Sequence, residues 1–337
     1  MGIKCLLKVK LDENIPMSST SEKSSTLTKS LFSAQTIVIT GLVWGVVALL
    51  FFLLFSVPLP GEELPEWYSV GTYIFELGAY LLASIVCLRN WQSPQMVSGR
   101  NVWMGIGLGL LFYFIAGVVF GCWELLWELD PDVSMADIFY VVSYIFLGWG
   151  MTLAVTSKRL NLEFWQWGVL AGVAVAGIAL AIWVADPSIF GLLFSPDATA
   201  LAEVDIEEIE EVSANLAPSW VIAIDEKLEP FAYFVNLFYI IADVFLLIIA
   251  TALLLAFWGG RFSQSWRMIA AATFSLYIAD MYFKWADTYL EGDYESGALL
   301  EVFFVFTAIL FGIGAVLEYD ISTRSRQSRR SRRSSSS

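Results

Sequence analysis

The sequence predicts an all-α membrane protein with about eight transmembrane helices. Hydrophobic residues make up 58% of the 337-residue chain and charged residues only 15%, whereas about a quarter of the residues in globular proteins are charged. Apolar runs of about 20 residues, the length that a helix needs to cross a bilayer core, recur along the chain. These runs are continuously apolar rather than alternating, which excludes a closed β-barrel.

Eight segments satisfy this length criterion, and each is expected to form one membrane-spanning helix. They are residues 33–57, 69–88, 102–127, 137–156, 165–185, 231–257, 268–290 and 296–318. The same pattern divides the chain into five parts: a disordered cytoplasmic leader (1–31), a first membrane repeat (32–185), an acidic extracytoplasmic loop (186–229), a second membrane repeat (230–318) and a basic Ser/Arg cytoplasmic tail (319–337).

The distribution of Lys and Arg predicts the orientation of the helices. If the N-terminus is cytoplasmic, every Lys and Arg except Lys227 and Lys284 falls on the cytoplasmic side. Basic residues accumulate on that side of membrane proteins. An even number of helices also returns the C-terminus there. We therefore expect both termini in the cytoplasm, with the bundle in the plasma membrane or in an internal membrane such as the thylakoid.

Composition also limits the chemistry. The chain has no histidine, which excludes imidazole catalysis and His-ligated haem or zinc. Its three cysteines, Cys5, Cys87 and Cys122, form no CxxC pair, so no thiolate metal site is expected. Phosphate-binding, GxSxG and kinase motifs are absent from the sequence. We expect no catalytic residues, no metal, no resident cofactor and no nucleic-acid partner.

An internal repeat relates the two halves of the chain. The matched features are the acid pairs Glu124/Asp137 and Asp287/Glu301, the Gly-x-Gly runs at 148–150 and 312–314, and the Tyr and acid pairs Tyr73/Glu76 and Tyr239/Asp243. Four spans return a chain to its starting side of the membrane. The halves are therefore expected to share one orientation, as two parallel four-helix repeats.

The motifs around this repeat support a resemblance to a known family. The run DPDVSMADIFYVVSYIFLGWGMTLAV contains an acidic-Pro loop and an S-x-A-D-x-x-Y helix start, and FVNLFYIIADVFLLIIATALLL contains Y-x-x-x-D. Residues 35–318 resemble the multi-helix membrane sensor regions that precede bacterial diguanylate cyclase (GGDEF), phosphodiesterase (EAL) and histidine kinase domains. The chain departs from that pattern because no output domain follows the last helix and because the 186–229 loop is long. The resemblance implies a sensor-like architecture.

Ionisable side chains inside membrane spans are functional candidates by default, because their burial is costly. Asp280, Lys284 and Asp287 have i, i+4, i+7 spacing on one helix face, and Tyr277 lies one turn earlier. This set is interpreted either as a salt-bridge ladder inside the bundle or as part of a proton relay or ligand site. The other candidates for a ligand site or proton pathway are Glu76, Glu124, Tyr239, Asp243 and Glu301.

Two different roles are expected for the remaining acids at or within the predicted spans. Asp137 follows Ser134 at the start of a predicted helix, where a carboxylate can accept hydrogen bonds from free backbone N–H groups. Glu76, Asp243 and Glu301 are expected to have no local cap to make and to point inward. Trp and Tyr residues at helix ends are interpreted as interfacial anchors; they are Trp67, Tyr68, Trp165, Trp167 and Trp266.

One alternative involves a pigment. The Asp280-x-x-x-Lys284 spacing is similar to that in the last helix of retinal proteins, where a Lys carries a Schiff base with an Asp as its counter-ion. Retinal at Lys284 is therefore an alternative to the absence of a cofactor. The eight predicted helices and the position of Lys284 near the outer end of its helix argue against it.

The 186–229 loop and the C-terminal tail are the expected contact regions. The loop carries 11 acidic residues and one Lys, and it is predicted to include an amphipathic helix over the bundle; a solvated acidic cap is the alternative. Its candidates for binding a protein partner are Glu203, Asp205, Glu207, Glu208, Glu210 and Glu211. The Arg-rich tail is expected to be disordered and to bind anionic lipid, at about 1 kcal/mol per charge.

The sequence thus favours a non-enzymatic integral membrane module for ligand sensing or protein association, acting in signalling or as a scaffold for a membrane complex. Its partners are expected to be the lipid bilayer and other membrane or extracytoplasmic proteins. The alternative is a secondary transporter or a proton or ion pathway that uses the intramembrane Asp, Glu and Lys residues.

Overall fold

The computed structural model describes residues 33–57, 64–129, 133–156, 162–185, 217–257, 263–290 and 296–334. These residues are almost entirely helical, and no strand occurs among them. The predicted leader, most of the acidic loop and several short connections lie outside the described residues. The prediction of an all-α protein is confirmed for the part of the chain that is described.

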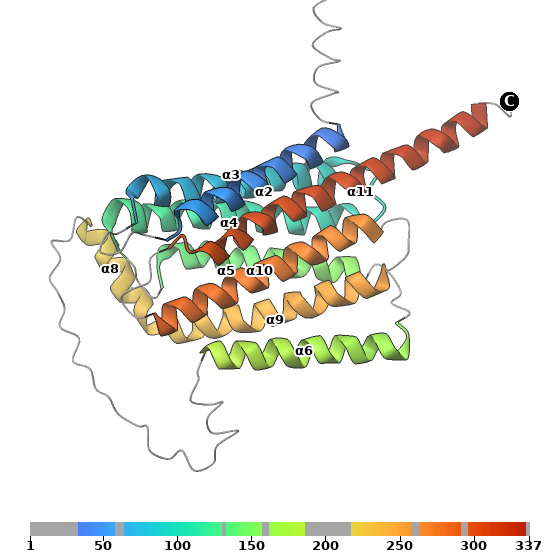
Figure 1. The fold of residues 1–337 in the computed structure, drawn as a ribbon. Helices are drawn as coiled ribbons and strands as arrows, with labels where there is room; N and C mark the ends of the chain where they lie inside the picture. The colour runs from blue at the N-terminus through green and yellow to red at the C-terminus, as the bar shows by residue number, and fades with distance from the viewer. Residues whose placement is uncertain are drawn as a thin grey trace, which may run out of the picture.

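A long helix occupies each of the eight predicted segments. The elements are α2 (Ala34–Phe55), α3 (Glu66–Gln92), α4 (Arg100–Trp127), α5 (Met135–Thr156), α6 (Phe164–Ala185), α8 (Ser219–Leu228), a 3₁₀ turn (Glu229–Phe231), α9 (Ala232–Ala256), α10 (Ser263–Tyr289), a second 3₁₀ turn (Leu299–Glu301) and α11 (Val302–Ser334). The long helices run side by side as one bundle (Figure 1).

Seven helical stretches among the described residues are long and apolar enough to cross a membrane, which makes this a multi-pass membrane protein. They correspond to every long helix except α10. That helix has 27 residues, which is sufficient length, but it is more polar than its neighbours. It packs against α9 and α11 and also contacts α6, so the surrounding helices shield much of its polar face from lipid.

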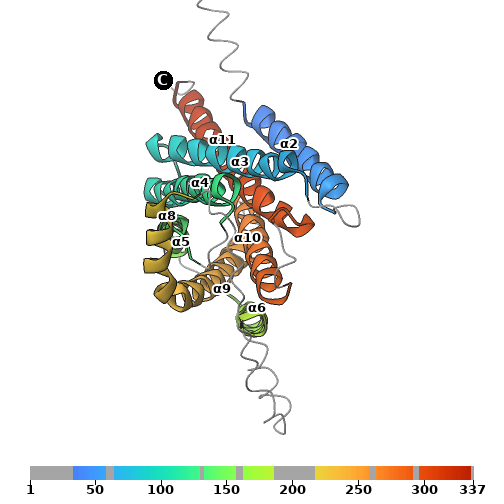
Figure 2. The ribbon, with the colours of Figure 1, turned by 90° about the vertical axis from the view of Figure 1, so that its left-hand side faces the viewer.

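Two helices, α2 and α6, lie at the edge of the bundle. Figure 2, which looks along the helices, shows α2 beside α3 and α11, and α6 beside α9 and α10. Only 17% of the 18-residue apolar stretch of α2, and the same share of that of α6, is buried, compared with 61% for the apolar stretch of α11. Their outward side chains include Leu54, 70% exposed, and Val175, 67% exposed. Such apolar surface is suited to contact with lipid.

Glycines allow the inner helices to approach closely. A methyl group added at Gly150 of α5 would lie 2.8 Å from the backbone nitrogen of Ile106 and 2.9 Å from the carbonyl oxygen of Val102, both in α4. At Gly314 of α11, it would lie 3.1 Å from the carbonyl oxygen of Ser265 in α10. Small residues permit this kind of backbone contact between membrane helices. Van der Waals packing therefore holds α5 on α4 and α11 on α10.

Part of the predicted acidic loop is a docked helix. α8 crosses the end of the bundle beside α4 and α5 (Figure 2). The indole N–H of Trp123 in α4 lies 3.1 Å from both carboxylate oxygens of Asp225, and Val221 is fully buried. The amphipathic helix expected earlier in this loop lies outside the described residues, as do the candidate partner-binding acids at 203–211.

The opposite end of the bundle is tied together by buried polar groups. The amide of Asn90 in α3 donates to the carbonyl oxygen of Ala315 at 2.7 Å. The backbone N–H of Ser98 donates to the Glu318 carboxylate at 3.2 Å. The guanidinium of Arg89 stacks on the ring of Tyr319. These contacts attach the end of α3 and the connection that follows it to α11.

Two predictions about helix ends were wrong. α11 continues as a helix to Ser334, where a disordered tail was expected, because no Gly or Pro follows Gly314 to interrupt it. Tyr68 and Trp266 were interpreted as interfacial anchors, but both side chains are buried. Tyr68 donates to the carbonyl oxygen of Gly297, and Trp266 packs against Trp103.

The close contact of α4 with α5 gives a first prediction. We expect Gly150→Ala to lower the free energy of unfolding by about 1–3 kcal/mol, because the methyl group meets backbone atoms that cannot rotate away. Thermal unfolding of the purified protein in detergent measures the change. Gly168→Ala is the control, since nothing lies within 4 Å of a methyl group there. An equal midpoint for both variants would contradict the packing argument.

Candidate functional site

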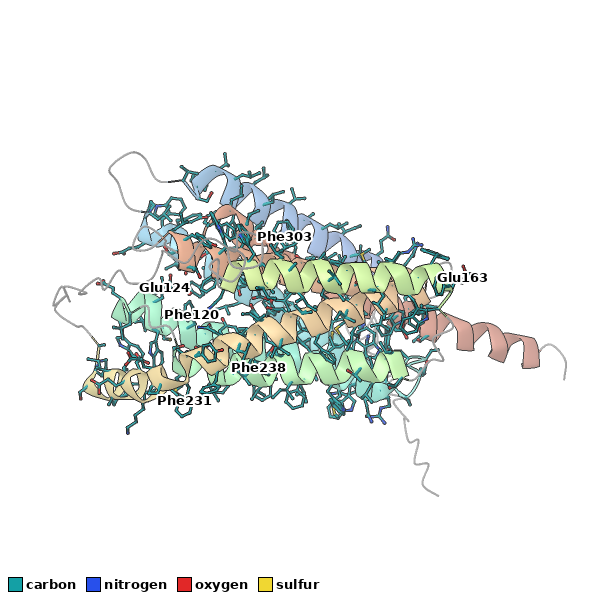
Figure 3. The ribbon with its side chains drawn as sticks, turned by 90° about the horizontal axis from the view of Figure 1, so that it is seen from below. Phe120, Glu124, Glu163, Phe231, Phe238 and Phe303 are labelled. Atoms are coloured by element: carbon teal, nitrogen blue, oxygen red, sulfur yellow. The ribbon has the colours of Figure 1, made fainter. Side chains whose placement is uncertain are left out.

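An acidic, aromatic cavity of about 190 Å³ lies between the helices at the α8 end of the bundle. Figure 3 labels Phe120 in this half of the molecule, near Glu124, whereas Glu163 lies at the opposite end. The lining residues come from six helices and the connection before α11; they are Glu76, Tyr113, Phe120, Asp137, Tyr140, Tyr144, Asn236, Tyr239, Ile240, Asp243, Asp280, Met281, Phe283, Lys284, Ser296, Glu301 and Phe304.

Helical spacing brings these side chains to the same place. Asp137, Tyr140 and Tyr144 of α5 are three and four residues apart, so they lie on one face of the helix. Asn236, Tyr239 and Asp243 have a similar spacing on α9, as do Asp280 and Lys284 on α10. Because α5 packs on α9 and α9 packs on α10, these three faces meet and form much of the cavity wall.

The centre of the site is a tyrosine between two carboxyl groups. The hydroxyl oxygen of Tyr144 lies 2.7 Å from Oδ1 of Asp243 and 2.6 Å from Oδ2 of Asp280. A hydroxyl has one proton and can donate to only one acceptor at a time. The second short contact therefore requires a proton on one of the two carboxyl groups. The geometry places Asp243, Tyr144 and Asp280 in one hydrogen-bonded cluster.

Asp243 retains an atom without a partner. Its side chain is 2% exposed, and its Oδ2 has no hydrogen-bond partner in the described part of the chain. Buried polar atoms in native proteins are nearly always satisfied by protein, water or a bound group. Since Asp243 lines the cavity, a group bound there can supply the missing partner.

Two of the lining acids cap helices. Oδ2 of Asp137 accepts from the backbone N–H of Ser134 at 2.8 Å, which confirms the predicted cap, and the Tyr239 hydroxyl donates to its other oxygen. Glu301 accepts from the backbone N–H groups of Gly297 and Ala298. The expectation that Glu301 has no local cap was wrong, because the chain turns at Gly297, which has φ +110°, and directs its N–H groups to the carboxylate.

Lys284 is the positively charged side chain that lines the cavity. Its Nζ donates to Oδ1 of Asn236 on α9 at 2.5 Å. Asp280, one turn earlier on the same helix, accepts a hydrogen bond from Tyr144 on α5. These two members of the predicted ladder thus have partners on different helices. The side chain of Asp287, its third member, lies outside the described residues.

The remaining predicted candidates have separate positions. Glu76 lines the cavity from α3. Glu124 does not line it and accepts a hydrogen bond from Tyr73, which joins α4 to α3. Tyr277 points away from the cavity toward α6, where it donates to the carbonyl oxygen of Gly177 at 2.8 Å. Tyr277 therefore attaches a peripheral helix rather than contributing to the site.

Several lining residues were missed by the sequence analysis. They are the aromatic side chains of Tyr113, Phe120, Tyr140, Tyr144, Phe283 and Phe304, together with Asn236. The spacing of Tyr140 and Tyr144 after Asp137 was a usable signal, since all three fall on one helix face. Phe120 and Phe304 carried no such signal, because Phe is common along every span.

With all its acids ionised, the cavity would have a large negative charge. Five carboxyl groups line it, those of Glu76, Asp137, Asp243, Asp280 and Glu301, together with the ammonium group of Lys284. The described residues contain no cluster of His, Cys, Asp or Glu arranged to hold a metal ion. Protons or a bound cationic group must therefore neutralise part of this charge.

Comparison with protein families, curated proteins and solved structures found no match to this chain. Its function is therefore inferred from the cavity and from the arrangement of the helices around it.

The tyrosine between the carboxyl groups gives a second prediction. We expect Tyr144→Phe to lower the free energy of unfolding by about 1–3 kcal/mol, because two buried carboxyl groups lose a hydrogen-bonding partner. Denaturant or thermal unfolding measures this change, with Tyr233→Phe as the control, because Tyr233 is 72% exposed. In an Asp243→Asn background the same change should destabilise less. Equal losses in both backgrounds would show that the hydroxyl does not act through Asp243.

Proposed function

We propose that this protein is a non-enzymatic membrane module that senses a small ligand bound in the acidic cavity. The observation that carries the proposal is the buried carboxylate of Asp243, one oxygen of which has no partner while it lines a cavity. Binding sites are typically concave, largely apolar and equipped with a few convergent polar groups. This cavity is concave and has convergent polar groups, although it is more acidic than most, with five carboxyl groups and one ammonium group among aromatic rings.

The position of the cavity supports a role in sensing. Its walls come from α3, α4, α5, α9, α10 and α11, so a bound ligand would touch helices from both halves of the chain. A ligand shifts a conformational equilibrium when it binds one packing of the helices better than another. Contact with both halves makes such a preference possible. The sensor-like motifs of the sequence agree with this role.

We also propose that the two halves are parallel repeats that meet at the cavity. Gly150 approaches Val102 and Ile106 in the first half, and Gly314 approaches Ser265 and Ile269 at the corresponding positions of the second. Asp137 and Glu301, matched in the sequence, both accept hydrogen bonds from backbone N–H groups at a helix start. Sites at the interface of such repeats are common in transporters.

The proposed orientation places the cavity toward the extracytoplasmic side. Arg89 and Arg100 lie at the end of the bundle opposite α8, and α11 extends there toward its Arg-rich segment. The positive-inside rule makes that end cytoplasmic, with both termini there. The Arg-rich segment would then meet anionic lipid. Association of a protein partner with the acids at 203–211 remains a further prediction, as does the identity of the membrane.

A specific observation favours a second candidate function, a proton or ion pathway coupled to transport. The Tyr144 hydroxyl joins Asp243 to Asp280, and chains of this kind relay protons in pumps and transporters. Proteoliposomes with a pH-sensitive dye distinguish the two functions. A proton flux that is lost in Asp280→Asn would support the pathway, whereas ligand binding without flux would support sensing.

The orientation gives a third prediction, which uses a variant whose native cysteines are replaced by Ala. A cysteine introduced by Glu226→Cys on α8 should react with a membrane-impermeant maleimide in intact cells. Ser334→Cys, at the end of α11, should react only after the membrane is permeabilised. Labelling of the Ser334→Cys variant in intact cells would reverse the proposed orientation.

The sensing proposal gives a fourth prediction. Screening the purified full chain against cationic, anionic, zwitterionic and neutral small molecules should identify compounds that raise its unfolding temperature, because a ligand that binds only the folded state stabilises it. Asp243→Asn should abolish that increase, and Glu226→Gln, an acid on α8 outside the cavity, should preserve it. If no compound shows a dependence on Asp243, the cavity is not a ligand site.

A further inference from the structure

We propose that the ligand of this cavity is a small organic cation, with its ammonium group bound beside the carboxyl groups of Asp243 and Asp280 and against the surrounding aromatic rings. This inference rests on the proposed ligand-sensing function and names the chemical class of the ligand. It depends on three properties of the cavity, which are its surplus of acids, its aromatic wall and its size.

The cavity still contains more acidic than basic side chains after the acids that cap helices are set aside. Asp137 and Glu301 are held by backbone N–H groups, as helix caps are in proteins generally. Glu76 and the one carboxyl group of the Asp243/Asp280 pair that lacks a proton remain in the cavity with the ammonium group of Lys284, which donates to Asn236. A buried carboxylate without a compensating charge is strongly unfavourable. A cationic ligand can supply that charge, and the partnerless oxygen of Asp243 is a place for its N–H or N–CH₃ groups.

The aromatic wall favours an organic cation over a metal ion. Seven rings line the cavity, those of Tyr113, Phe120, Tyr140, Tyr144, Tyr239, Phe283 and Phe304. The negative face of an aromatic ring attracts ammonium groups, and aromatic cages with a nearby carboxylate are characteristic of quaternary ammonium sites. Metal ions such as Ca²⁺ and Mg²⁺ instead require six or more oxygen ligands, including water. The described residues contain no group of three or more His, Cys, Asp or Glu side chains placed to hold a metal ion.

The size of the cavity suits a molecule larger than an ion. Its volume is about 190 Å³, which is many times the roughly 10–15 Å³ that a cavity needs to hold one water molecule. A bare metal ion would leave most of that space unfilled, whereas an alkylammonium compound would contact the rings and the carboxyl groups together. Primary amines and quaternary ammonium compounds both satisfy this description, and the experiment includes both.

The test uses the full chain purified in a non-ionic detergent. The probes are methylammonium, tetramethylammonium, putrescine and choline, with sodium chloride at equal ionic strength as the control for screening. The neutral tert-butyl analogue of choline, in which carbon replaces nitrogen, has the same shape without the charge. Unfolding temperature and isothermal titration calorimetry measure binding. We expect at least one organic cation to bind, and its neutral analogue and sodium to have no effect.

Variants locate the bound cation. Asp243→Asn and Asp280→Asn should each weaken its binding about tenfold or more, because each removes a charge-assisted contact. Phe120→Leu keeps every charge but removes one ring, so it should weaken binding without altering the acids. This variant also tests the proposal if the Asn variants fold poorly. Glu226→Gln removes an equal charge outside the cavity and should bind like the native protein.

The outcomes separate this inference from the function on which it rests. Equal binding of choline and its neutral analogue would overturn it, because recognition would then not depend on charge. If no organic cation binds but an anionic, zwitterionic or neutral compound stabilises the native protein and not Asp243→Asn, the inference fails while the sensing function stands. If no compound of any class shows a dependence on Asp243, both fail.

Discussion

Acids buried inside a membrane bundle must be neutralised by the protein, by protons or by a bound group, because hydrocarbon offers no water to solvate them. The arrangement at the α8 end follows from this constraint. Asp137 and Glu301 accept hydrogen bonds from the backbone at helix starts, and Tyr144 joins Asp243 to Asp280. Oδ2 of Asp243 has no hydrogen-bond partner in the described part of the chain, and Asp243 lines the cavity. We therefore place the function there.

The packing of the helices makes this site possible. Close contact at Gly150 and Gly314 holds α5 against α4 and α11 against α10, while α2 and α6 present apolar surface at the edge of the bundle. α10 carries Asp280 and Lys284, and among the described residues it is the long helix that is not apolar enough by composition to be recognised as membrane-spanning. α10 packs against α6, α9 and α11, and both side chains line the cavity, so the bundle can accommodate a helix that is more polar than its neighbours.

Ligand sensing and proton or ion transport would use the same groups in different ways. A sensor needs a ligand whose binding changes the packing of the two halves, whereas a pathway needs protons or ions to enter and leave on opposite sides. The hydrogen-bonded cluster of Tyr144, Asp243 and Asp280 is compatible with both. The phenylalanine rings beside these acids, Phe120, Phe283 and Phe304, favour a bound organic cation, because a phenyl ring carries no transferable proton but attracts an ammonium group.

The sequence by itself determined the helical membrane architecture, because bilayer thickness sets the length of an apolar run and lipid permits few irregular segments. It also identified Glu76, Asp243, Asp280 and Lys284 as unusual, since charge within a span is visible without coordinates. Only the tertiary structure decided which of these acids meet, that Tyr277 faces α6, and which rings line the cavity. Contacts between helices depend on the rotation of each helix about its axis, and nearly uniform apolar spans leave that rotation undetermined until the helices pack.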